Sequence, residues 1–392
     1  MPHARSRVLL VAGLASAWVG ACSSFDADDT QPAIEDGGTD SPSAVDGRSE
    51  GEAGGDASVA CSPSLPPEGP KATCGTETDV EILNNPNHCG GCGHACVTCA
   101  NGLCPVETVA NVGGVELLLT PEAYILGEST GGEVWRAPRN GQAPVMLHSF
   151  GAGDNTQGLA MDGDHLFVGA YQGVYEFDLD AGTGKTVQTA TDRRVGFGQT
   201  KDELFWGGFT SSLVFMQKDG GNVREYGKVA TGAESTGVAA DDKGVYWIRR
   251  HVDGGPLAEI LVRTPDNSVK TRLDGLEDPA SLVLDADYLY WVSGSRRELL
   301  RAPRAGTDRP TVIARWTDPV YTLSRGAVLG GSFVYWTLRH ASDTGAFVIL
   351  RAPKDCNGEV VTIAKGTFFT NLVVEGDHVY YGNSFKTFRV TR

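Results

Sequence analysis

Short apolar segments recur at nearly equal intervals between residues 106 and 392. Five of these segments carry two adjacent aromatic residues, and the second aromatic of each pair is Trp206, Trp247, Trp291, Trp336 or Tyr381. These positions lie 41, 44, 45 and 45 residues apart. Two earlier segments fit the same frame with Ile125 and Val168 in place of the Trp. The pattern therefore predicts seven repeats of one structural unit.

Each repeat divides into four β-prone segments. In the fourth repeat the segments are Gly237–Ala240, Val245–Ile248, Glu259–Arg263 and Val269–Leu273. Proline follows or ends the third segment in several repeats, where a missing backbone donor does little harm to a strand. Four strands in a repeat of 40–45 residues are typical of one propeller blade. The fold class is therefore all-β, a seven-bladed β-propeller.

The two ends of the repeat region complement each other. The last repeat stops at Thr391 after its third strand, whereas Val106–Ala110 precedes the first repeat and is similar to the fourth strands of other repeats. We expect this N-terminal strand to complete the seventh blade, because closing the ring removes exposed strand edges. A solenoid is the structural alternative, but it leaves Val106–Ala110 without a role.

The Tyr335-Trp336-Thr337 run and its Tyr-Trp relatives resemble the tyrosine-tryptophan (YWTD-like) repeats of receptor-type propellers. They are also similar to TolB-like bacterial propellers of unknown function. This resemblance covers about 285 residues through short motifs. It implies the fold and implies no particular activity.

Residues 1–21 have the organisation of an export signal, with a basic start followed by the apolar stretch Val8–Trp18. Val19-Gly20-Ala21-Cys22 resembles the lipobox of bacterial lipoproteins. The resemblance implies acyl chains on Cys22, and Ser23 after the cysteine is similar to the outer-membrane sorting pattern of Gram-negative bacteria. The alternative is an ordinary signal peptide that happens to end near a cysteine.

Residues 22–60 are predicted to be a disordered tether. The segment holds ten acidic residues and one basic residue, Arg48, and almost no large apolar side chains. Such a composition cannot bury enough surface to offset the entropy of ordering. We interpret it as a spacer between the membrane and the folded part.

Residues 61–105 form a cysteine-rich segment ahead of the propeller at 106–392. The cysteines outside the lipobox are Cys61, Cys74, Cys89, Cys92, Cys96, Cys99, Cys104 and the distant Cys356. Their spacing could hold zinc or an iron–sulfur cluster, but an exported chain meets an oxidising environment that favours disulfides. We expect four disulfides, one of them to Cys356, and no metal. The connectivity is not readable from the sequence.

The formal net charge of −16 argues against nucleic-acid binding through phosphate contacts. The 51 glycines agree with a fold rich in tight turns. Acidic residues precede most of the aromatic strands, including Asp164, Asp202 and Asp242. A calcium ring is conceivable there, but turns in which Asp bonds its own backbone explain the pattern more simply.

A candidate site can be placed on the propeller face that carries the connections between blades. Two second-to-third loops, Arg249–Pro256 and Leu338–Gly345, are long, and each contains an Arg-His pair. The candidate ligand-binding residues are Arg193, Arg194, Arg249, His251, Trp316, Arg339 and His340. These basic and aromatic groups favour an anionic or sugar-like ligand.

Three function classes remain open on the sequence. The first is a lipid-anchored envelope protein, expected at the outer membrane of a Gram-negative bacterium, whose propeller binds an envelope protein or glycan. The second is a hydrolase or lyase that uses His251 and His340 as base and acid. The third is a purely structural envelope component. No motif indicates a cofactor, and the sequence indicates no oligomeric state.

Overall fold

The computed structural model describes residues 69–74, 76–128, 132–151, 154–189, 194–208, 213–226, 233–251, 257–306, 308–316, 321–323, 326–340, 346–367 and 371–392. The expected signal, the acidic tether, Cys22 and Cys61 lie outside these residues. Every regular element in the described ranges is a β-strand. The search for a membrane-crossing helix within those ranges found none of sufficient length and apolarity.

Seven four-stranded or five-stranded antiparallel sheets form the blades. Blades one and two consist of β4 (Glu116–Leu119), β5 (Ala123–Gly127), β6 (Glu133–Pro138), β7 (Val145–Ser149), β8 (Thr156–Asp162), β9 (His165–Ala170), β10 (Gly173–Asp178) and β11 (Thr183–Thr189). Blades three and four consist of β12 (Arg194–Gln199), β13 (Glu203–Gly208), β14 (Leu213–Gln217), β15 (Arg224–Tyr226), β16 (Ala233–Asp241), β17 (Gly244–His251), β18 (Ala258–Arg263) and β19 (Val269–Leu276).

Blades five and six consist of β20 (Pro279–Leu284), β21 (Tyr288–Ser293), β22 (Glu298–Pro303), β23 (Thr311–Arg315), β24 (Tyr321–Leu323), β25 (Val328–Gly330), β26 (Phe333–His340), β27 (Ala346–Pro353) and β28 (Val361–Thr367). Blade seven consists of β29 (Val373–Glu375), β30 (His378–Gly382), β31 (Thr387–Thr391) and β3 (Val106–Ala110). A separate hairpin of β1 (Lys71–Cys74) and β2 (Glu77–Glu81) precedes them.

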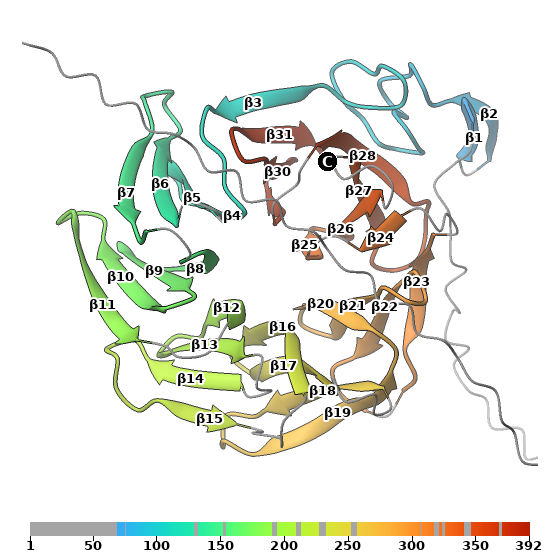
Figure 1. Ribbon diagram of the computed structural model, residues 1–392. Helices are drawn as coiled ribbons and strands as arrows, with labels where there is room; N and C mark the ends of the chain where they lie inside the picture. Colours follow the sequence, from blue (N-terminus) through green and yellow to red (C-terminus); the bar gives the residue numbers. More distant parts are fainter. Residues whose placement is uncertain are drawn as a thin grey trace, which may run out of the picture. The chain divides into compact units, whose positions relative to one another are not determined.

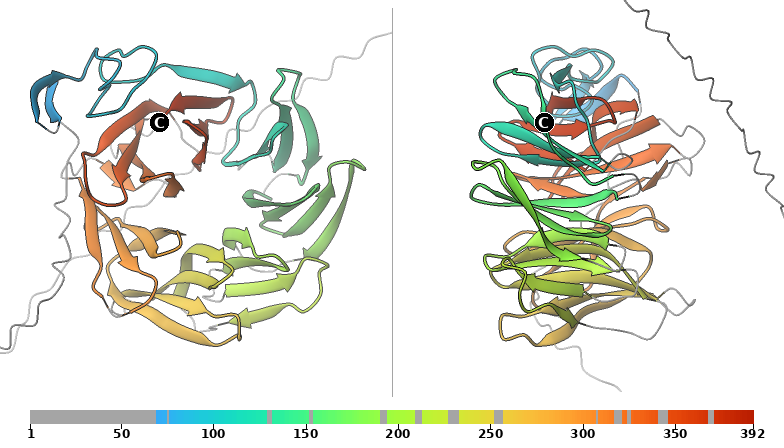
Figure 2. Two further views of the ribbon diagram at one scale, coloured as in Figure 1. Left: turned by 180° about the vertical axis from the view of Figure 1, so that it is seen from behind. Right: turned by 60° about the vertical axis from the view of Figure 1, so that its left-hand side comes forward.

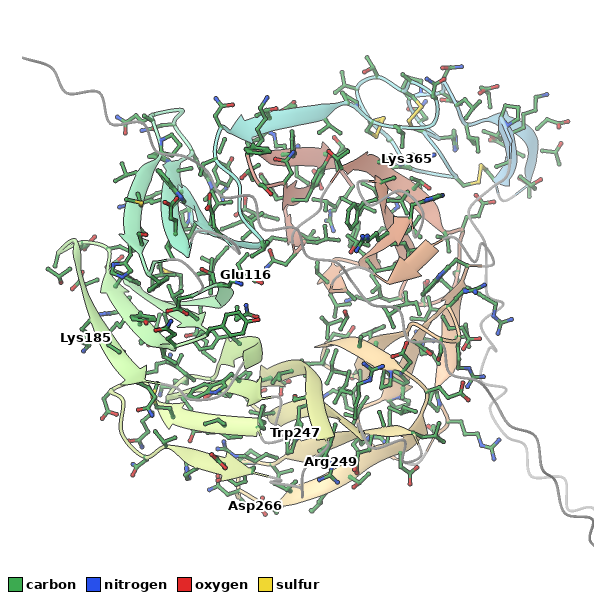
Figure 3. The ribbon with its side chains drawn as sticks, viewed as in Figure 1. Glu116, Lys185, Trp247, Arg249, Asp266 and Lys365 are labelled. Atoms are coloured by element: carbon green, nitrogen blue, oxygen red, sulfur yellow. A yellow bond between two sulfur atoms is a disulfide. The ribbon has the colours of Figure 1, made fainter. Side chains whose placement is uncertain are left out.

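The seven sheets form a closed ring, which Figure 1 shows in front view and Figure 2 from behind and from the side. The first strands of successive blades contact each other around the ring, and β29 of the last blade contacts β4 of the first. Figure 3 places Glu116 of the innermost strand β4 toward the centre and Lys185 of the outermost strand β11 toward the periphery. This closure excludes the solenoid and confirms the seven-bladed propeller.

The N-terminal strand completes the last blade, as the sequence predicted. Strand β3 pairs antiparallel with β31, with Val106 opposite Val390 and Thr108 opposite Phe388. The ring is therefore closed by strands from opposite ends of the repeat region, which leaves neither blade seven nor blade one as an open end.

The recurring Trp residues form the core between blades. Trp247, Trp291 and Trp336 are each at most 1% exposed. These Trp residues lie on second strands, as predicted. In blade one, however, the residue that takes the position of the Trp was predicted one place too early. Ile125 pairs with Arg136 just as Tyr290 pairs with Arg301, so Leu126 holds the Trp position.

The cysteine-rich segment is closed by disulfides and packs on the propeller. Three bonds join Cys74 to Cys92, Cys89 to Cys99 and Cys96 to Cys104. Cys356 in blade six is also disulfide-bonded. The buried Cys89 and Cys104 share a core cluster with apolar residues of blades six and seven. Disulfide bonding of these described cysteines is confirmed, and it gives a short segment rigidity that its few apolar side chains could not supply.

Candidate functional site

The predicted binding residues that the structure describes fall at one end of the blades, which we name the entry face because the connections between blades lie there. Arg194 begins β12, while His251 and His340 end β17 and β26, and these strand ends all point to the entry face. Arg193 lies outside the described residues, as do the side chains of Arg194 and His251. The two predicted long loops are shorter than expected, because Arg249–His251 and Leu338–His340 belong to strands.

Trp316 is a core residue. Its side chain is only 5% exposed and belongs to a cluster with Ile313, Val334 and Trp336. The expectation of an aromatic group at an open mouth is therefore wrong for this residue. The polar neighbours Arg315 and Thr317 suggested an exposed loop, but Trp316 packs in the same core cluster as Ile313 and Ala314 of β23.

The arginines of β17 are already paired with acids. Arg249 donates from Nε to Glu259 Oε1 at 2.7 Å, across the ladder of the same blade. Arg250 forms an ion pair with Asp278, which follows β19 and leads into blade five. Figure 3 shows Arg249 on β17, two residues beyond the buried Trp247. Both guanidinium charges are thus balanced within the protein.

The two histidines of the enzyme hypothesis do not share a blade junction. His251 pairs with Ala233 in blade four, and His340 pairs with Tyr321 in blade six. Blade five stands between them. An acid–base pair must reach one reacting group together. Both strands end at the entry face, but the side chain of His251 lies outside the described residues, so the pairing of the two histidines stays a prediction.

The opposite end of the blades carries a repeated ion pair that the sequence analysis missed. We name this end the latch face; it holds the turns between first and second strands and between third and fourth strands. The residue directly after the third strand is basic in five blades. In order from blade one to blade seven these residues are Arg139, Leu179, Lys218, Thr264, Arg304, Lys354 and Arg392.

Four of these basic side chains reach an acid in the preceding blade, and we call each such pair a latch. The acid is the last residue before the first turn of that blade. The nitrogen–oxygen distances are 2.6 Å for Arg139–Glu375, 2.9 Å for Lys218–Asp162, 2.7 Å for Arg304–Asp241 and 3.2 Å for Lys354–Asp285. The latches therefore tie neighbouring blades together at four junctions.

Aromatic rings complete three latches. Arg304 Cζ lies 5.0 Å from the ring centre of Tyr246, and Lys354 Nζ lies 5.9 Å from that of Tyr290. Arg139 lies over Tyr380 at 6.0 Å. A cation over an aromatic face is stabilising, more so when water is excluded. The first aromatic residue of the Tyr-Trp pair thus has a specific role that its partner Trp does not share.

The latches hold their acids in the charged form. The hydrogen bond from Arg139 lowers the pKa of Glu375, and the hydrogen bond from Lys218 lowers the pKa of Asp162. Burial acts to raise the pKa of Asp241, but the hydrogen bonds from Arg304 and from backbone amides outweigh it, so this pKa is also lowered. Side-chain bonding across blades therefore stabilises ionised carboxylates.

Two junctions have neither member of the latch. Between blades one and two the equivalent residues are Thr120 and Leu179, and between blades three and four they are Thr200 and Thr264. Both junctions are hollowed. A cavity of about 480 Å³ is lined by Thr120 and Leu179, and one of about 560 Å³ by Thr200 and Thr264. Short uncharged side chains leave open the space that an arginine or lysine fills elsewhere.

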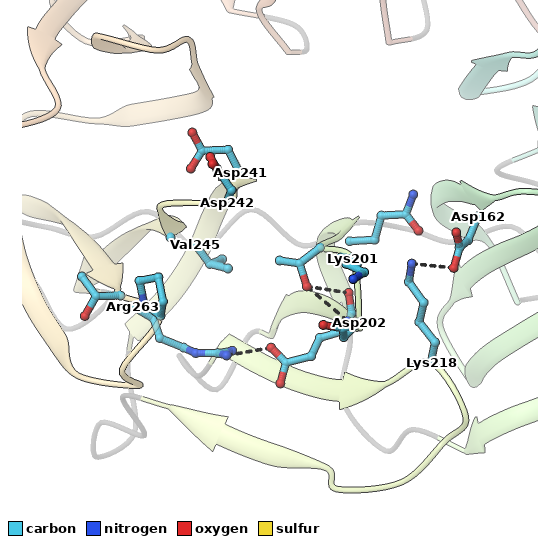
Figure 4. A pocket seen from close by; sticks show the side chains of 14 residues that line it. Asp162, Lys201, Asp202, Lys218, Asp241, Asp242, Val245 and Arg263 are labelled. Carbon is cyan, nitrogen blue, oxygen red and sulfur yellow. Dashed lines mark hydrogen bonds and ion pairs between the residues drawn. The ribbon is translucent and has the colours of Figure 1, made fainter.

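Figure 4 shows the side chains that line the larger of these two cavities, and several of them are charged. Lys218–Asp162 forms one wall, and Arg263 donates to Glu203 at 2.7 Å on another. The turn residues Lys201, Asp202 and Asp242 also line it. Among the described residues these three side chains form no ion pair. The rim of the cavity therefore carries one ammonium and two carboxylates, all on exposed turn residues.

The acidic turns have a different explanation from a calcium ring. The side chains that bind are Asp162, Asp241, Asp285 and Glu375, whereas Asp164, Asp202, Asp287 and Asp377 accept backbone N–H groups through their carbonyls. For three of the four latches the sequence signal was present at the end of the third strand, as Pro138-Arg139, Pro303-Arg304 and Pro353-Lys354, whereas Lys218 follows Gln217. It was interpreted only as a strand stop.

Comparisons with known proteins support the fold. No family model and no curated protein matches the chain. Among solved structures, the extracellular domain of the putative hybrid two component system BT4673 from B. thetaiotaomicron aligns with a TM-score of 0.56 and 12% identity, over 73% of this chain and 39% of that chain. YCF48 bound to D1 peptide aligns with a TM-score of 0.54 and 8% identity, over 74% and 96%. A chain of the Mitotic Checkpoint Complex aligns with a TM-score of 0.52 and 10% identity, over 74% and 93%. At these identities the likeness places the chain among β-propellers by fold alone.

Proposed function

We propose that this protein is an exported, lipid-anchored component of the cell envelope that displays its propeller as a rigid binding module. The observation that carries the proposal is the disulfide-closed segment packed on blades six and seven. Disulfides of this kind persist in oxidising compartments outside the cytoplasm. The export signal and the lipobox-like Val19–Cys22 agree with that location.

The binding role is supported by the ring itself. Latches fix four of the seven junctions, so the blades are held in a defined arrangement. Hollowed junctions on the same face then provide preformed polar surfaces. A rigid frame with a few preformed cavities lowers the entropy cost of binding. Candidate partners are an envelope protein, a glycan or a small polar ligand.

The hydrolase or lyase alternative stays a prediction, because the strands of His251 and His340 end at the same face on separate blades and the His251 side chain lies outside the described residues. The proposal is therefore restricted to binding.

Lipid anchoring is tested by metabolic labelling of the protein with palmitate in a Gram-negative host. We expect the wild-type chain to incorporate label and to sediment with the outer membrane. Cys22→Ser abolishes both, because the acyl chains need the cysteine thiol and two or three chains are required for stable anchoring. The neighbouring variant Ser24→Ala serves as the matched control and keeps both properties. Equal labelling of wild type and Cys22→Ser would refute the anchor.

A further inference from the structure

The junction between blades three and four combines three features that together indicate a ligand. It lacks both latch residues, it is an open hollow of about 560 Å³, and its rim carries exposed charged turn residues of both signs that form no ion pair within the described part of the chain. Sites for small molecules are preformed hollows in about this range of size, with a few placed polar groups. The cavity at the junction between blades one and two has the first two features only. Its cation Arg136 is paired with Glu122, so its unpaired charges, Asp164 and Asp180, are all negative.

The paired walls of the larger cavity narrow the choice of ligand. Lys218 is neutralised by Asp162, and Arg263 is neutralised by Glu203 at 2.7 Å. These walls attract neither a pure anion nor a pure cation. The unpaired groups that remain are Lys201, Asp202 and Asp242. A complementary ligand therefore carries one negative and two positive charges.

We propose that this cavity binds a free basic amino acid, arginine or lysine. Its carboxylate pairs with Lys201, and its two cationic groups pair with Asp202 and Asp242. The alkyl-cation side chain then occupies a junction where Arg304 and Lys354 of other blades place the same chemical group. The proposal deepens the binding function proposed above by naming the ligand class of one site on the latch face.

Isothermal titration of the purified full chain with L-arginine, L-lysine, L-citrulline and L-glutamate tests this assignment. We expect arginine and lysine to bind. Citrulline has nearly the shape of arginine without its side-chain charge, and we expect it to bind at least about tenfold more weakly, because one charge-assisted hydrogen bond contributes about that factor. Glutamate, with the opposite charge balance, gives no heat of binding.

Variants test the residues. Asp242→Asn and Lys201→Met each weaken arginine binding at least about tenfold. The control Asp180→Asn makes the same chemical change in the cavity between blades one and two and leaves the affinity unchanged. The double variant Thr200→Asp with Thr264→Arg rebuilds a latch across the junction. It is expected to abolish binding while its melting temperature stays at or above that of the wild type.

Three results would overturn the assignment: no binding of arginine or lysine, equal binding of citrulline and arginine, or full binding by the folded latch-rebuilt variant. Such a result leaves the lipid anchor untouched, because palmitate labelling of Cys22 tests that separately.

Discussion

Single side chains in this protein owe their properties to where the fold buries them. His94 is fully buried between the cysteine-rich segment and the propeller. Its Nδ1 lies 2.6 Å from the Cys89 carbonyl oxygen and its Nε2 lies 3.3 Å from that of Thr391. Burial, and then the positive charge of Arg351, lower the pKa of His94. The neutral imidazole is therefore favoured in the folded state. It carries a single N–H, so it donates to one of these two carbonyl oxygens and lies in contact with the other, between the segment and the last strand of the ring.

This burial predicts a pH dependence of folding. The unfolded chain protonates His94 near pH 6.5, whereas the folded chain does so only at lower pH. The neutral imidazole thus stabilises the fold fully above about pH 6.5 and loses that contribution as the pH falls through the folded pKa. We expect the difference in unfolding free energy between wild type and His94→Gln to shrink from pH 7.5 to pH 5. Urea denaturation at several pH values measures it, and a constant difference would contradict the assignment.

At the scale of elements, the junction between two blades is the unit that varies. All seven blades are antiparallel sheets of the same kind, but the chemistry between blades changes from a buried latch to an open cavity. Arg304 and Asp241 make the most complete latch, because the Arg304 side chain is 6% exposed and also contacts Tyr246. The strands build the ring, and the turn residues decide which junctions are closed.

The latch between blades four and five predicts a large loss of stability on substitution. Arg304→Met leaves Asp241 without its partner, and we expect a loss of about 2–3 kcal/mol. This is less than the about 3–5 kcal/mol typical of a fully buried pair, because the Asp241 side chain keeps 26% exposure. A double-mutant cycle with Asp241→Asn isolates the coupling. The exposed Arg309→Met in the same blade is the control, and equal effects of the two arginine variants would argue against the latch.

The strands could be predicted from the sequence wherever a buried residue recurs at the same position of each blade. Trp206, Trp247, Trp291 and Trp336 recur because each second strand faces the same inter-blade core. The polar ends of strands show no such recurrence. The second strand of blade four was therefore expected to end at Ile248, but β17 continues through Arg249, which pairs with Glu259 on the neighbouring strand. Trp316 was misplaced because an aromatic residue among polar neighbours has no periodicity.

The candidate cavity was beyond the sequence for a different reason. It depends on two missing side chains, Thr200 and Thr264, that belong to different blades and lie 64 positions apart. Their equivalence becomes visible only when the repeats are aligned to the exact residue. An absent charge also leaves no pattern of its own in a sequence.

At the scale of the whole molecule, one strand closes the ring. Strand β3 comes from the start of the propeller and pairs with β31 at its end, where Arg389 Nε donates to Glu107 at 2.7 Å. Without β3, the outer edge of β31 would be open to other chains.

Removing this strand is expected to destabilise the propeller as a whole. Two fragments test this, one beginning at Val106 and one at Val112, each with Cys356→Ser to remove the unpaired thiol. We expect the shorter fragment to unfold at a lower denaturant concentration and to form oligomers on size-exclusion chromatography. Both fragments lack the cysteine-rich segment, so their difference reports on residues 106–111 alone. Identical behaviour of the two would show that ring closure contributes little.

Ring closure also sets the order in which the chain can fold. Glu107 and Arg389 are 282 residues apart, so the first propeller strand to be synthesised is among the last to find its partner. The entropy of closing so long a loop rises only slowly with length, but pairings this distant slow the search for the native state. A ribosome-bound chain cannot complete the ring before its final residues appear. For the exported protein proposed here this delay is an advantage, because a chain that stays unfinished in the cytoplasm remains able to thread through a narrow translocation channel and to oxidise its cysteines on the far side.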